Sequence, residues 1–186
     1  MKPILTDILC TQCGLCCDGS LFADVELAGR TEASGLEVMG LEIEEDDDGA
    51  AELLLQPCRA LQGKRCGIYP HRPECCRTFE CRLLQNVRSG AVDVIQAREK
   101  IAVALQRIER IKELIVQLRP GNEHLPLKER CAEALVFSEG AASNPEIARQ
   151  RDELEAAMIA VENLIQETFL AARFGPRKKT NSRPTR

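Results

Sequence analysis

The chain has 186 residues, a formal net charge of −4, 44% hydrophobic residues and only 3% aromatic residues. It holds no apolar run of the ~20 residues that a membrane helix needs, and Met1-Lys2-Pro3-Ile4 lacks the charged and apolar regions of a signal peptide. We therefore expect a cytoplasmic protein without membrane contact. The hydrophobic content excludes a fully disordered chain, and the scarcity of aromatic residues predicts a core of Leu, Ile, Val and Ala, as in helical proteins.

The first 90 residues are rich in Cys and in turn-forming residues, and they predict short elements. Residues 21–27 and 53–55 read as strands. Residues 31–40 predict a short helix that Gly40 ends, although a hairpin of residues 36–39 and 41–44 explains the alternation equally well. We expect an irregular cysteine-cluster metal-binding domain over residues 1–90.

The next zone, residues 91–175, predicts long helices. Residues 91–118 carry an apolar residue at two positions of each heptad, and Pro120-Gly121-Asn122 stops the pattern. A shorter helix is expected over 125–139. Asn144-Pro145 has the form of a helix cap followed by a first-turn proline, so the last helix runs from there to about residue 174.

The expected fold class is mostly α. A small irregular Cys-rich domain with short strands and helices is followed by a long antiparallel helical hairpin or bundle. Because helices with short connections usually pair within one chain, we favour an intramolecular core over a dimer seam. A protein partner or self-association through the helical half stays open as an alternative.

Charge is distributed unevenly along the chain. Residues 24–52 hold eleven acidic residues against Arg30, a net −10, and the run Glu44 to Asp48 before Gly49 predicts an exposed turn. Residues 173–186 hold six basic residues and no acidic one. Since Phe174 is the one aromatic residue there that could stack on a base, we interpret residues 176–186 as a solvated, disordered tail and expect no nucleic-acid binding.

The chain has ten cysteines, nine of them between Cys10 and Cys81. In a reducing cytosol this density indicates metal ligation or redox chemistry rather than disulfides. Cys10-x2-Cys13 can place two thiolates on one metal by a tight turn, and Gly14 can adopt the positive φ that turns amides toward the sulfurs. Cys16 adds a third ligand, and Cys17 points elsewhere, toward a second metal.

Spacing alone does not select the metal. Thiolate-only ligation suits zinc and iron–sulfur clusters alike. A ferredoxin pattern would require a cysteine followed by proline where Ser20 and Leu21 stand, and the radical-SAM spacing is absent from the sequence. A classical zinc finger needs paired histidines, whereas the chain has only His71 and His124, both interpreted as surface loop residues.

These residues, together with Ile68-Tyr69 and Arg72-Pro73, resemble the CxxCxxCC, or YkgJ-type, cysteine cluster family. Its members are proposed to chelate zinc or iron, and a related domain occurs in flagellin lysine N-methylase. The resemblance covers residues 10–81, and it implies metal chelation without a settled reaction. It implies eight metal ligands: Cys10, Cys13, Cys16, Cys17, Cys58, Cys66, Cys76 and Cys81.

Eight thiolates suit two four-coordinate sites, or one cluster and one zinc. The expected cofactor is therefore an iron–sulfur cluster or zinc, in a redox or metal-handling protein. An enzyme related to methyltransferases and a structural-zinc interaction module are the alternatives, and no catalytic residue is identified. Cys75 is interpreted as a spare thiol, and Cys131 as a small buried apolar residue of a helix.

Overall fold

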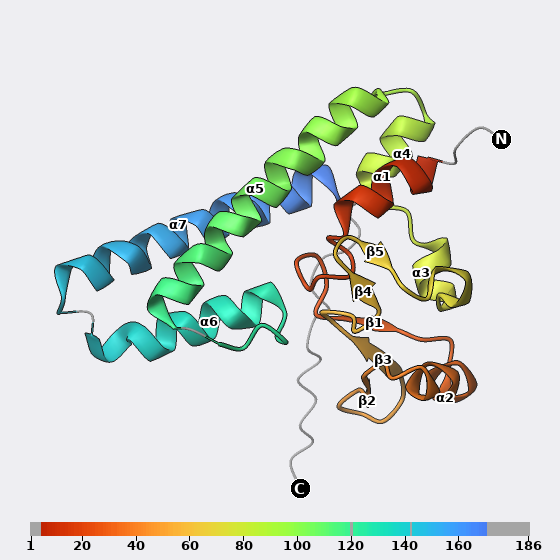
Figure 1. Ribbon diagram of the computed structural model, residues 1–186, viewed down its shortest axis with the longest axis horizontal. Helices are drawn as coiled ribbons and strands as arrows, with labels where there is room; N and C mark the ends of the chain where they lie inside the picture. The colour runs from red at the N-terminus through yellow and green to blue at the C-terminus, as the bar shows by residue number, and fades with distance from the viewer. Residues whose placement is uncertain (1–4, 120, 142, 171–186) are drawn as a thin grey trace, which may run out of the picture.

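The computed structural model describes residues 5–119, 121–141 and 143–170 (Figure 1). The mostly α fold predicted from the sequence is confirmed, with two small sheets beside long helices. Two long helices, α5 (Val94–Leu118) and α7 (Pro145–Thr168), run along one side of the molecule, and the strands gather in a smaller lobe. Among the described residues no helix is both long and apolar enough to cross a membrane.

The smaller lobe contains a three-stranded antiparallel sheet with strand order β1-β3-β2. The strands are β1 (Asp24–Glu26), β2 (Ile43–Glu45) and β3 (Glu52–Leu55). Leu54 in the middle strand pairs with Val25 on one side and with Ile43 on the other. Helix α2 (Arg30–Val38) contributes Ala33 and Leu36 to the same apolar cluster, called here the sheet core.

The structure decides between the two interpretations of residues 31–44. Helix α2 forms and is followed by Gly40, which has φ +83°, so the predicted helix is confirmed and the hairpin of residues 36–39 with 41–44 is wrong. Residues 43–45 are a strand, but they pair with β3 because that register places Ile43 against buried Leu54. Of the strand expected over 21–27, residues 24–26 are extended.

The acidic run Glu44 to Asp48 is only partly the predicted exposed turn: Glu44 and Glu45 belong to β2, and the exposed turn covers residues 47–49. The side chain of Asp46 accepts hydrogen bonds from the backbone N–H groups of Ala50 and Ala51, at 2.7 and 3.1 Å. Arg30 pairs with Glu37 and with Glu52, which links α2 to β3. Part of the acidic charge is therefore neutralised within the lobe.

Helix α5 begins at a capping box. The carboxylate of Asp93 accepts the Gln96 N–H at 2.8 Å, and the Gln96 side chain accepts the Asp93 N–H at 3.2 Å. The cap explains why the helix starts at Val94, three residues later than predicted. Both apolar positions of each heptad face inward, and the buried ones are Ala97, Ile101, Ala104, Ile108, Ile111, Ile115 and Leu118.

The two helices that follow are also close to the expected ranges. Helix α6 (Leu127–Ser138) runs into a 3₁₀ turn, η2 (Glu139–Ala141). Asn144 caps α7 by accepting the Glu146 N–H at 2.9 Å, as its position before a proline predicts. Helix α7 ends at Thr168 with Phe169 as its C-cap, so the predicted end near residue 174 is wrong. The Gly175-Pro176 stop and the tail at 176–186 lie outside the described residues.

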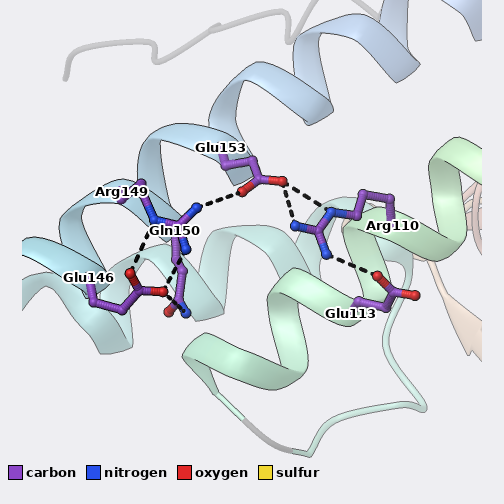
Figure 2. A network of polar contacts seen from close by, with 6 residues as sticks. All are labelled: Arg110, Glu113, Glu146, Arg149, Gln150 and Glu153. Atoms are coloured by element: carbon purple, nitrogen blue, oxygen red, sulfur yellow. Dashed lines mark hydrogen bonds and ion pairs between the residues drawn. The ribbon is translucent and has the colours of Figure 1, made fainter.

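Helices α5 and α7 pack as the predicted antiparallel pair, with α6 against both. Their exposed edges carry an ion-pair network (Figure 2). Arg110 of α5 donates to Glu153 of α7 at 3.0 and 2.5 Å, and Glu153 also lies 3.6 Å from Arg149. Glu146 binds Arg149 in turn at 2.6 Å. The network therefore joins the two long helices outside their apolar seam.

The main apolar cluster, called here the helical core, extends beyond the hairpin. It takes Leu9 from α1 (Leu5–Cys13) and Leu83 and Leu84 from α4 (Arg82–Arg88). Helix α1 was not predicted: its cysteines are on a helical turn rather than on the tight turn that the Cys-x-x-Cys spacing suggested. Helix α1 packs against α4 and α5, so the first cysteines rest on the helical core.

Candidate metal centre

The first cysteine stretch consists of the end of α1 and the loop that follows it. Cys10 and Cys13 are three residues apart on α1, which places them on one face of the helix. Gly14, with φ +75°, ends the helix, and its carbonyl accepts the Cys17 N–H at 2.8 Å. The predicted positive φ of this glycine is thus confirmed. Leu15, fully buried, fixes the loop between Gly14 and the two following cysteines.

Helices α5 and α6 hold this loop from outside. Lys112 of α5 pairs with Asp18 at 3.6 Å, and the backbone N–H of Leu127, the first residue of α6, donates to the Gly19 carbonyl at 3.0 Å. A Cβ on Gly19 would lie 3.0 Å from the Cα of Pro126. The loop and α6 are therefore in close backbone contact.

The second cysteine stretch is built around a small hairpin. Strands β4 (Leu61–Gln62) and β5 (Arg65–Cys66) pair antiparallel, so Cys66 lies opposite Leu61. The Leu61 N–H donates to the Cys58 carbonyl at 2.9 Å, which places Cys58 at the base of the hairpin. The Cys58 N–H in turn donates to the carbonyl of Cys17 at 2.8 Å, so a backbone hydrogen bond joins the two stretches.

Two short helices carry the remaining cysteines. The 3₁₀ turn η1 (Tyr69–His71) leads to α3 (Glu74–Thr78), which contains Cys75 and Cys76. Cys81 is the N-cap of α4. The Tyr69 hydroxyl donates to Asp7 of α1 at 3.1 Å, which links η1 to the first helix.

All eight predicted ligands line one cavity of about 890 Å³. A ninth cysteine, Cys75, lines it as well, with its sulfur 4.0 Å from that of Cys76. The cysteines of the cavity are Cys10, Cys13, Cys16, Cys17, Cys58, Cys66, Cys75, Cys76 and Cys81. Residues that are distant in the sequence are therefore gathered around one space, and all nine thiols are free.

Burial raises the pKa of most of these thiols. It raises the pKa of Cys10 to about 11 and those of Cys13 and Cys17 to about 12, with neighbouring thiols adding to the effect. For Cys81 the rise caused by burial is partly offset by the backbone amides of Leu84 and Leu83, which lower the pKa. Without metal, Cys10, Cys13 and Cys17 are therefore protonated near neutral pH, and a metal ion would displace their protons on binding.

Basic side chains line the cavity beside the sulfurs. They include Lys64, Arg72 and Arg77. The Arg72 guanidinium lies 3.7 Å from the centre of the Tyr69 ring and donates through Nε to the Tyr69 carbonyl at 3.2 Å. Arg59, also near the cysteines in sequence, pairs instead with Glu42.

The donor set fits a thiophilic metal, because sulfur ligands select zinc, copper(I) and iron–sulfur clusters. In the described ranges, no three Cys, His, Asp or Glu side chains lie close enough together to share one metal ion. The sulfurs surround the cavity rather than converge on one point. A bound group would therefore draw them inward by side-chain rotation about Cα–Cβ.

The remaining candidates are placed as expected. Cys131 is 1% exposed inside the helical core and is not among the residues that line the cavity. His71 and His124 are exposed.

Two aromatic residues of the cavity wall, Phe22 and Phe169, were not predicted. The ring of Phe22 packs edge-on against Phe79 at 5.3 Å. Phe169, at the end of α7, lines the same cavity, and its carbonyl accepts the Arg82 N–H at 2.9 Å. No local sequence signal links Phe169 to the cysteines, since the contact exists only in the folded chain.

A comparison with known families identifies the cysteine half. The model of the CxxCxxCC family, described as "Putative zinc- or iron-chelating domain", matches residues 9–104. The match spans just over half of the chain, so the protein belongs to this family. Neither the curated proteins nor the solved structures that we searched gave a match.

Proposed function

We propose that this protein binds one or more iron–sulfur clusters through the eight family cysteines and serves in electron transfer or metal handling. Metal binding in general follows from the family, whose domain is described as zinc- or iron-chelating. The observation that supports the finer assignment is the thiol-lined cavity of about 890 Å³. When bound, an iron–sulfur cluster supplies a one-electron redox couple.

The size of the cavity favours a cluster over a single ion. A structural zinc is enclosed by four ligands, with sulfurs about 2.3 Å from the metal, and such a site is closed. A cavity of several hundred Å³ between the sulfurs provides room for a group of several iron and sulfide atoms. A full set of thiolate ligands would leave no open coordination position, which argues against metal-dependent hydrolysis.

The charges around the cavity support the same assignment. Thiolate-bound clusters carry net negative charge, and nearby positive groups offset it and tune the reduction potential. Lys64, Arg72 and Arg77 line the cavity and can provide this compensation.

The first experiment is purification without oxygen, followed by measurement of iron, acid-labile sulfide and visible absorption. We expect brown protein that contains both iron and sulfide. Colourless protein with about two zinc ions per chain would refute the iron–sulfur assignment and support a structural or metal-handling zinc centre. Clear binding of S-adenosylmethionine by the pure protein would instead favour an enzyme of methyl transfer.

Serine variants test the ligand assignment. We expect Cys13→Ser and Cys66→Ser each to lower the metal content, because each removes a thiolate that lines the cavity. Cys131→Ser is the matched control, since this buried cysteine of the helical core is not a cavity-lining residue. Equal metal loss in Cys131→Ser would contradict the assignment.

A further inference from the structure

We propose that the eight thiols form two separate four-thiolate sites whose membership the fold determines. The first, called the helix set, is Cys10, Cys13, Cys16 and Cys81. The second, called the hairpin set, is Cys17, Cys58, Cys66 and Cys76. The inference rests on the proposed function, in that it requires these thiols to bind metal, and it adds the division that the family pattern lacks.

The helix set is brought together by the packing of α1 on α4. Cys10 and Cys13 share one face of α1, and Cys81 caps α4, which packs against α1. Burial is the largest cause of the raised pKa of Cys10, Cys13 and Cys16, and Cys81 adds to all three rises, although Cys17 contributes more than Cys81 to that of Cys16. The packing of α1 on α4 thus brings the helix set to one part of the cavity wall, and a bound metal would draw the four sulfurs together by side-chain rotation.

The hairpin set is brought together by backbone pairing. The Cys58 N–H binds the Cys17 carbonyl, and the β4–β5 hairpin places Cys66 on the chain segment that folds back toward Cys58. Cys58 and Cys66 are the two thiols that raise the pKa of Cys17 most. Helix α3 contributes the fourth sulfur: the sulfur of Cys76 lies 4.0 Å from that of Cys75, which packs on the sheet core with Cys58. The pKa of Cys76 is raised by the Cys75 hydrogen bond and by burial, with smaller contributions from Cys17 and Cys58.

The two apolar cores separate the sets. Cys13 and Cys81 pack against the helical core, whereas Cys58 packs against the sheet core together with Cys75. Cys16 and Cys17 are neighbours in sequence and are where the sets meet. The three ligand thiols that pack on a core, Cys13, Cys81 and Cys58, thus divide between the cores as they divide between the sets.

Arg72 lines the cavity and acts on a thiol of each set. Its positive charge lowers the pKa of Cys10 in the helix set and that of Cys17 in the hairpin set. Its position is fixed by the Tyr69 ring and carbonyl. One guanidinium therefore faces both proposed sites.

The direct test uses the full-length wild-type chain, stripped of metal under reducing conditions. The chain is loaded with about one Zn²⁺ per molecule, since each zinc takes four thiolates. Free thiols are then alkylated, and the intact protein is fragmented in a mass spectrometer to locate the protected cysteines on single molecules.

We expect molecules with four protected thiols, and in each molecule those four belong to one set. Protected quartets that mix the sets, such as Cys13 with Cys58, would overturn the inference. A population made up only of molecules protected at all eight thiols and molecules protected at none would also overturn it, because two independent sites would give many molecules with four protected thiols. Failure to bind Zn²⁺ would overturn the inference alone, whereas the proposed function fails if protein purified without oxygen lacks iron and sulfide, so the two failures are distinguishable.

Double variants provide the second measurement. We expect Cys13→Ser to reduce bound Zn²⁺ from about two ions to about one per chain. Adding Cys81→Ser, in the same set, should leave that value unchanged, whereas adding Cys66→Ser, in the other set, should remove the remaining ion. A loss of both ions in Cys13→Ser/Cys81→Ser would refute the partition, provided that circular dichroism shows the helices intact.

Discussion

Phe169 joins the helical hairpin to the thiol cavity, and its removal tests that connection. The side chain is 1% exposed, and its carbonyl accepts the N–H of Arg82, the residue after Cys81. Full burial of a phenylalanine contributes about 1.5–3 kcal/mol. The cavity left by Phe169→Ala adds to this, so we expect a loss of about 3–5 kcal/mol in the free energy of unfolding.

Two assays read out this variant. Urea denaturation of the metal-loaded protein gives the change in stability, and competition with a chelator gives the rate of metal release. We expect faster release from Phe169→Ala, because the ring supports the chain segment that positions Cys81. Metal that is retained as in the wild type, in a variant destabilised as expected, would show that the hairpin and the cavity are independent.

Phe137→Ala is the matched control. Phe137, on α6, is 63% exposed, and its ring contacts Arg119 at 5.3 Å. We expect this variant to lose no more than about 1 kcal/mol and to retain metal normally. An equal loss of stability in the two variants would refute the claim that burial of Phe169 sets the magnitude.

Three further predictions concern local structure. Gly14→Ala should destabilise the protein by about 1–2 kcal/mol, because the backbone at Gly14 has φ +75°. Gly35→Ala is the control: Gly35 lies in α2 and a Cβ there would meet no other atom, so this variant should stabilise the protein by about 0.5–1 kcal/mol. Denaturation curves of the two variants measure both changes. Asp93→Ala should cost about 1 kcal/mol, also measured by denaturation, since it removes the α5 cap, and an unchanged stability would contradict the capping role. Arg149 holds the pKa of Glu146 below 4.5, so this carboxylate stabilises the fold above that pH and the contribution disappears as pH falls through the lowered value. The melting temperature of Glu146→Gln should therefore be below that of the wild type at neutral pH and approach it in acid.

The long helices could be predicted from the sequence because their signals are local and repeat. The heptad stripe of α5 and the Asn144-Pro145 start of α7 each act within a few residues. Their antiparallel pairing was predicted as well, and it holds although α6 lies between them in the chain.

The sheet and the first helix depended on contacts that the sequence does not display. Strand β2 pairs with β3 because Ile43 and Leu54 share the sheet core, a choice made in three dimensions. Helix α1 was hidden because the Cys-x-x-Cys spacing suits a turn as well as a helix, and burial of Leu9 in the helical core favours the helix.

The eight ligands were proposed from a family resemblance, and the structure adds that all eight line one cavity. The spacing of Cys10 and Cys13 predicted that these two lie close together. It gave no indication that Cys17 lies near Cys58, because that contact depends on the backbone hydrogen bond between their segments. Cys75 could not be separated from Cys76 by pattern, and in the structure both line the cavity.

The contacts of the cysteine loop argue that metal binding stabilises the whole chain. The family match ends at residue 104, inside α5, yet Lys112 and Leu127 hold the loop at Asp18 and Gly19. Binding to the folded state alone adds its free energy to stability. Because the helices beyond the matched segment support the loop, that free energy should raise the unfolding temperature of α5 and α6 as well as that of the cysteine lobe. A single thermal transition that moves upward on metal loading is the expected result, and two transitions with only one of them shifted would refute it.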